Sequence, residues 1–85
     1  MNINSHEFED IYQTFHVRLT EEVNALPMSH KEVIRRLECG NSVLYTWLDG
    51  RVKPSAYYVA KLALLGCDIV YILTGIHTQG GDFDV

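Results

Sequence analysis

The sequence holds little of what several classes of protein require. Its 85 residues include only two cysteines, two prolines and six glycines, which excludes a disulfide scaffold, a collagen-like chain and a low-complexity chain. No apolar run approaches the roughly 20 residues of a membrane-spanning helix. The first ten residues, MNINSHEFED, also lack the basic and apolar stretches of a secretory signal. We therefore expect a cytoplasmic protein that makes no use of a membrane.

Size and composition indicate one small globular domain. Hydrophobic residues make up 47% of the chain and charged residues 21%, close to globular averages. A chain of this length can bury one core but not two. We interpret Cys39 and Cys67 as buried, reduced thiols; a single disulfide between them is the alternative.

The charge is unevenly distributed along the chain. The net charge is −4, yet the stretch from Ser29 to Lys61 holds six basic residues against three acidic ones. The remainder holds one basic residue, Arg18, against eight acidic ones. A positive middle in an acidic chain is compatible with a nucleic-acid partner, because local field governs binding more than total charge does.

Hydrophobic periodicity predicts helices and no strands. The first helix begins near Ser5, ends before Pro27 and carries an apolar stripe at spacings of three and four: Phe8, Ile11, Tyr12, Phe15, Leu19, Val23 and Leu26. A helix opening at Pro54 or Ser55 is expected to turn these residues inward: Tyr58, Val59, Leu62, Ala63 and Leu65. A last short helix follows the cap residue Asp68, ends at Gly75 and closes the core with Ile69, Ile72 and Leu73.

Two further helices lie in the basic middle. The Ser-x-x-Glu capping box at 29–32 predicts a helix over 29–37, a turn containing Gly40 follows, and a helix over about 41–48 ends at Asp49-Gly50. With these, the fold class is all-α: a compact five-helix bundle. We expect Val33, Ile34 and Leu37 to pack against Leu44 and Trp47, while the second helix exposes a polar face: Asn41, Ser42, Tyr45 and Thr46. Two short helices joined in this way form a helix-turn-helix.

No residue pattern of enzymatic chemistry is present. The four histidines and two cysteines are not spaced as metal ligands. The sequence has no phosphate-binding Gly-rich loop and no Gly-x-Ser-x-Gly. We expect no catalytic site, cofactor, metal or small-molecule substrate.

Ser29 through Pro54, with the later Lys61-Leu62-Ala63 and Tyr71-Ile72-Leu73-Thr74-Gly75, resembles the lambda-repressor-like (Cro/repressor, XRE-type) helix-turn-helix family. The likeness runs from about Phe15 to Gly75, and the segment from Leu65 onward looks most like prophage repressors. The family's fold is a five-helix bundle whose dimers bind palindromic operators. The resemblance therefore implies base reading by His30, Asn41, Ser42 and Tyr45, and phosphate contacts by Thr46, Arg51 and Lys53.

The sequence departs from the family in three places. Ile34 stands where a small residue is usual, and its bulk alters the packing between the two helices. Glu38 and Gly40 stand where Gly and Ser or Thr are common, which leaves the turn geometry open. Asp49 replaces a frequent Asn; its carboxylate either repels phosphate or bonds the backbone of the turn.

These observations lead to the following expectation. Residues 1–14 extend the first helix, 15–75 form the DNA-binding domain, and 76–85 are a flexible or interface tail. We expect a transcriptional regulator, either a small Cro-like protein or the N-terminal part of a longer repressor, that binds a double-stranded operator as a homodimer. Surplus apolar residues are the candidate dimer interface: Phe8, Ile11, Tyr12, Ile76 and Phe83. The alternative is a protein-interaction module, such as an antirepressor or antitoxin-like protein with little DNA binding.

Overall fold

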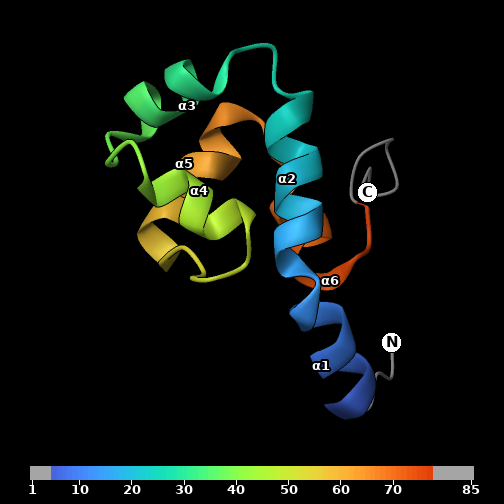
Figure 1. The fold of residues 1–85 in the computed structure, drawn as a ribbon. Coiled ribbons are helices and arrows are strands. Elements are labelled where there is room, and N and C mark those ends of the chain that lie inside the picture. The colour runs from blue at the N-terminus through green and yellow to red at the C-terminus, as the bar shows by residue number, and fades with distance from the viewer. Residues whose placement is uncertain (1–4, 78–85) are drawn as a thin grey trace.

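The computed structural model describes residues 5–77, which form six helices and no strand within that range (Figure 1). They are α1 (Ser5–Gln13), α2 (Phe15–Ala25), α3 (His30–Leu37), α4 (Val43–Leu48), α5 (Ala56–Leu65) and α6 (Ile69–Thr74). The all-helical prediction is confirmed, but the helix count is six rather than five. None of the helices in this part of the chain is long and apolar enough to cross a bilayer.

The sixth helix arises because the expected first helix breaks at Thr14. Thr14 has φ −98° and ψ 16°, outside the helical range, and its hydroxyl donates to the Ile11 carbonyl at 3.0 Å. The apolar stripe continues across this break, so the sequence periodicity gave no sign of it. As a result α1 extends beyond the rest of the bundle, at the lower end of Figure 1.

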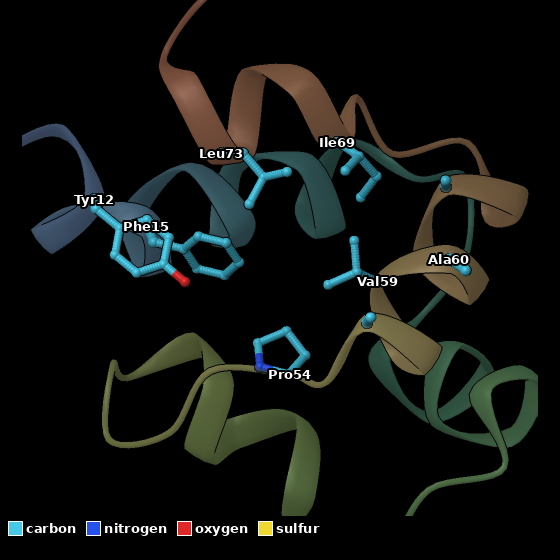
Figure 2. Close-up of a pocket in the computed structure, with 9 residues that line it drawn as sticks. Tyr12, Phe15, Pro54, Val59, Ala60, Ile69 and Leu73 are labelled. Atoms are coloured by element: carbon cyan, nitrogen blue, oxygen red, sulfur yellow. The ribbon is translucent and has the colours of Figure 1, made fainter. Parts of the chain in front are cut away.

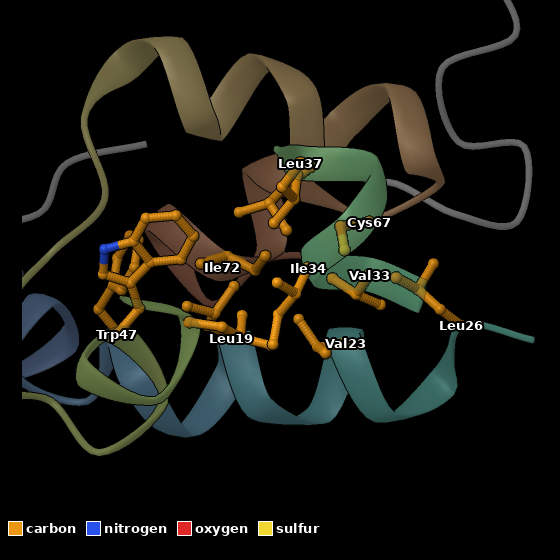
Figure 3. Packing of buried hydrophobic residues seen from close by; sticks show 12 residues of the cluster. Leu19, Val23, Leu26, Val33, Ile34, Leu37, Trp47, Cys67 and Ile72 are labelled. Atoms are coloured by element: carbon orange, nitrogen blue, oxygen red, sulfur yellow. The ribbon is translucent and has the colours of Figure 1, made fainter. Parts of the chain in front are cut away.

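The core is built from residues of α2, α3, α4, α5 and α6, and Figure 3 shows it as one continuous cluster. Leu19, Val23, Val33, Leu37 and Leu44 are fully buried there. The predicted burial on the two middle helices is confirmed, since their five expected inward residues all belong to this buried cluster: Val33, Ile34, Leu37, Leu44 and Trp47. Cys67 is buried and Cys39 half-buried, and both are free thiols.

On α5 the inward face was predicted correctly except for Ala63, since Leu62 is buried and Tyr58, Val59 and Leu65 are half-buried. Ala63 is exposed, and Leu62 is the only residue of that helix that is fully buried. The helix is apolar around most of its circumference, so a spacing of three and four does not select one face.

The residues that cap the ends of helices were predicted correctly in three cases. The Ser29 hydroxyl caps α3 by accepting the Glu32 amide at 3.1 Å, and the Asp68 carboxylate caps α6 by accepting the Tyr71 amide at 3.0 Å. Gly66 ends α5 with a φ of 117°, a left-handed conformation that suits glycine.

A buried arginine connects three parts of this fold. Arg18 on α2 is 9% exposed, and its guanidinium donates to the Ile72 carbonyl at 3.0 Å and to the Ile11 carbonyl and the Thr14 hydroxyl at 2.6 Å each. Ile11 and Ile72 lie in the last turns of α1 and α6, where helix carbonyls carry partial negative charge. The cation therefore holds the ends of both helices against α2.

Replacing Arg18 by Met should lower the free energy of unfolding by about 3 kcal/mol, because two carbonyls and a hydroxyl lose a charged donor. Urea denaturation of the parent and the variant measures this difference. Arg36→Met, at an exposed arginine of α3, is the matched control and should cost about 0.5 kcal/mol or less. Equal losses in the two variants would contradict the role assigned to Arg18.

Candidate nucleic-acid interface

The turn after α3 depends on an unusual backbone conformation. Glu38 has φ 56° and ψ 40° and is the only non-glycine residue between 5 and 77 with a positive φ. Lys61 on α5 stabilises this end of α3, since its ammonium donates to the Leu37 carbonyl at 2.9 Å and to the Glu38 carboxylate at 3.2 Å. The turn geometry that the sequence left open is thus left-handed at Glu38.

The sequence placed Asn41 and Ser42 in the first turn of the second middle helix. In the structure they lie in the turn before α4. The Val43 amide donates to the Gly40 carbonyl at 3.1 Å, which tightens the chain ahead of the helix, and α4 begins at Val43. The prediction failed because end signals locate a helix only to within two or so residues. Both side chains are exposed, beside the start of α4.

His30 and Tyr45, which are 15 residues apart, come together at the start of α3. The His30 Nε2 atom lies 2.8 Å from Asn24 Oδ1, and the Tyr45 hydroxyl lies 3.4 Å from His30 Nδ1. This fits a ring that donates from Nε2 and accepts at Nδ1. Asn24, at the end of α2, was not singled out from the sequence, and no local pattern there could have identified it.

Tyr45 is 45% exposed, whereas the hydroxyl of the adjacent Thr46 already makes a hydrogen bond within α4. The Thr46 hydroxyl donates to the Val43 carbonyl at 2.6 Å and is part-buried. Of the two, Tyr45 offers the freer surface for an incoming ligand, and a phosphate contact by Thr46 requires a rotation of its hydroxyl.

Asp49 binds Arg51 and the backbone of the turn after α4. Its carboxylate accepts the Arg51 amide at 3.0 Å and the Arg51 Nε at 2.8 Å. These bonds lower the pKa of Asp49 below its usual range. Of the two roles expected for Asp49, the structure shows the hydrogen bond to the backbone of the turn. The same carboxylate also neutralises the charge of Arg51.

The other basic side chains between Ser29 and Lys61 differ in whether a carboxylate neutralises them. Arg35 and Arg36 share the carboxylate of Glu32, and their hydrogen bonds lower the pKa of that carboxyl to about 2. Lys53 lies with its ammonium 4.7 Å from the centre of the Tyr12 ring, and Lys31 is exposed on α3. The net positive charge therefore resides on α3 and on the loop before α5.

The expected interface residues occupy different environments. Phe8 and Ile76 are 46% and 39% exposed, while Ile11 and Tyr12 are half-buried. Tyr12 packs between the rings of Phe8 and Phe15, with centroid distances of 5.6 and 5.7 Å. Phe83 lies outside the described residues.

Comparison of the chain with protein-family models, with curated proteins and with solved structures gave no match.

The left-handed turn yields a stability prediction. Glu38→Gly should unfold with about 1 kcal/mol more free energy than Glu38→Ala, since both variants lose the carboxylate but only glycine adopts this φ without steric cost. Denaturant titrations of the two variants give the difference directly. If they were equally stable, Glu38 would not adopt the left-handed conformation in solution.

Proposed function

We propose that this protein is a sequence-specific DNA-binding regulator that uses α3 and α4 as a helix-turn-helix and acts as a dimer. The observation that carries the proposal is the contact of Tyr45 with His30, together with the exposure of Asn41 and Ser42 just ahead of α4. Asn41, Ser42 and Tyr45 are exposed and His30 is half-buried, and polar side chains near the start of the second helix are what base reading in a major groove requires.

The chemistry of these side chains suits base edges. An asparagine amide pairs with adenine N6 and N7 in a bidentate manner, and a serine hydroxyl both donates and accepts. Tyr45 presents a ring for a thymine methyl and a hydroxyl for a phosphate. Its contact with His30 limits its rotamers, so less conformational entropy is lost on binding.

The turn between the helices supports the same proposal. Glu38 adopts the left-handed conformation at the position where the resembled family commonly has glycine. Residues 38–42 join the two short helices, and the left-handed residue at the start of this connection lets the chain reverse without that glycine, which supports the proposed helix-turn-helix.

The proposed dimer follows from the small size of the recognition surface. One copy offers few base and phosphate contacts, whereas two copies related by a two-fold axis read half-sites about 34 Å apart. A palindromic operator is the expected target.

A protein-interaction module is the second candidate. The ion pair of Asp49 with Arg51 favours it, because a neutralised arginine contributes little to phosphate binding. The exposed polar residues before α4, Asn41 and Ser42, favour DNA binding over this alternative.

Selection of bound duplexes from a random pool tests the proposal, and we expect a palindromic motif. Asn41→Ala should then weaken binding to the selected duplex by about 1–3 kcal/mol and binding to a scrambled duplex little. Lys53→Ala, the matched control, should weaken both alike. Equal losses on both duplexes for Asn41→Ala, with an intact fold, would remove this turn from the reading surface.

Asp49→Asn should strengthen binding to any duplex, because the amide keeps the turn hydrogen bond but releases the charge of Arg51. With about −0.9 per phosphate contact, the slope of log K against log salt should steepen by roughly 2 per dimer, from about −4 to about −6. Titrations at several salt concentrations measure the slope, and the double variant Asp49→Asn, Arg51→Ala should return it to the parent value. A slope near zero for the parent would support the interaction module.

A further inference from the structure

Side chains from three different helices form a chain of hydrogen bonds at the start of α3. Asn24 lies near the end of α2, His30 is the first residue of α3, and Tyr45 lies on α4. The His30 Nε2 atom is 2.8 Å from Asn24 Oδ1, and the Tyr45 hydroxyl is 3.4 Å from His30 Nδ1. The rings of His30 and Tyr45 are also neighbours, with centroids 5.7 Å apart. The imidazole of His30 thus connects Asn24 with Tyr45.

The chemistry of these atoms fixes the direction of both hydrogen bonds. An amide oxygen only accepts, so the Nε2 atom of His30 carries the proton that binds Asn24. In a neutral imidazole the other nitrogen then holds a lone pair and no proton. The Tyr45 hydroxyl therefore donates to Nδ1. Its one proton is used within the protein, and only the lone pairs of its oxygen remain for a ligand.

We infer that the Tyr45 oxygen accepts a hydrogen bond from the amino group of a base, adenine N6 or cytosine N4, and that Asn24 is the positioning residue that sets this polarity through His30. The inference rests on the proposed function and specifies how one of its reading side chains discriminates between bases. It takes the place of a phosphate contact by this hydroxyl, because phosphate oxygens bind donors and the hydroxyl has no proton left to donate.

The major groove offers this oxygen a clear choice. Adenine presents its N6 amino group there and cytosine its N4 amino group, whereas guanine presents the acceptors O6 and N7 and thymine the acceptor O4. A hydroxyl that rotates freely pairs with either kind of base edge. A hydroxyl whose proton is held by His30 Nδ1 pairs only with an amino base.

The environments of the three side chains suit these roles. Tyr45 and Asn24 are exposed, while His30 between them is half-buried. Both ring nitrogens of His30 are used within the protein, so the imidazole has no polar atom left for a base. In this arrangement His30 acts through Tyr45, in place of the direct base contact that the family resemblance implies.

Nuclear magnetic resonance of the isotope-labelled protein tests the hydrogen-bonded chain without DNA. We expect an Nε2–H proton of His30 that exchanges slowly enough with water to be observed, and an Nδ1 resonance typical of an unprotonated ring nitrogen. Asn24→Ala should abolish the Nε2–H signal, and Asn24→Asp, whose carboxylate also accepts, should retain it. A proton on Nδ1 in the parent, or an Nε2–H signal that Asn24→Ala leaves unchanged, overturns the inference.

Duplex binding tests the base contact. The probes are the selected duplex and duplexes in which one adenine is replaced by guanine, or one cytosine by thymine, with its pairing partner; each change puts a carbonyl where the amino group was. At one position the parent should prefer the amino base about tenfold, since the wrong base leaves a hydrogen bond unmade. Tyr45→Phe should lose that preference, and Asn24→Ala should reduce it to about threefold or less.

Two variants are the matched controls. Asn24→Asp should keep the parent's preference, because the added charge affects both duplexes alike and cancels in their ratio. Lys53→Ala should also keep it while weakening binding to both duplexes. Circular dichroism checks that the Asn24 and Tyr45 variants fold, as the exposure of both side chains leads us to expect.

The outcomes separate the inference from the proposed function. If the parent selects a palindrome but Tyr45→Phe keeps every base preference, or Asn24→Ala keeps the one that Tyr45→Phe loses, the inference fails and the proposed function stands. If no duplex is selected, the proposed function fails and the base contact fails with it, while the resonance experiment still shows whether Asn24, His30 and Tyr45 are hydrogen-bonded.

Discussion

The buried guanidinium of Arg18 is the constraint on which the rest of the structure depends. A cation at 9% exposure is tolerable only when its donors are satisfied, and here oxygens of Ile11, Thr14 and Ile72 satisfy them. Because these oxygens come from the end of α1, the break and the end of α6, a single side chain sets the relative positions of three helices. That arrangement also places Tyr12 and Leu73 on two sides of an open apolar hollow of about 370 Å³ (Figure 2).

On the polar surface of α3 and α4 most basic side chains form ion pairs with neighbouring carboxylates. Glu32, Glu38 and Asp49 each hold at least one cation of the basic middle. Exposed pairs of this kind contribute little to stability, but they reduce the number of cations available to a polyanion. In the proposed DNA complex, such a surface gives modest non-specific affinity, and discrimination comes mainly from the side chains proposed to read bases.

Exposed apolar side chains lie on several helices, among them Phe8 on α1, Val17 on α2, and Tyr57 and Leu64 on α5. The small core of this 85-residue protein buries Leu62 of α5, so much of the apolar circumference of this helix lies outside it. Lys61 connects this helix to the end of α3, because its ammonium donates to the Leu37 carbonyl at 2.9 Å.

The sequence by itself determined what depends on neighbours in the chain. Ser29 and Asp68 as caps, the glycines at helix ends and the buried faces of α3 and α4 all follow from local hydrogen bonding and helical periodicity. The tertiary structure alone decided the break at Thr14, the outward side of α5 and the meeting of His30 with Asn24 and Tyr45. Tyr45 lies 15 residues from His30, and Arg18, which binds Thr14 at the break, reaches Ile72 across 54 residues; periodicity carries no information about such distant partners. The start of α4 was determined in part by the sequence: the signals near Gly40 predicted that a helix begins there, but they placed its first residue two positions too early.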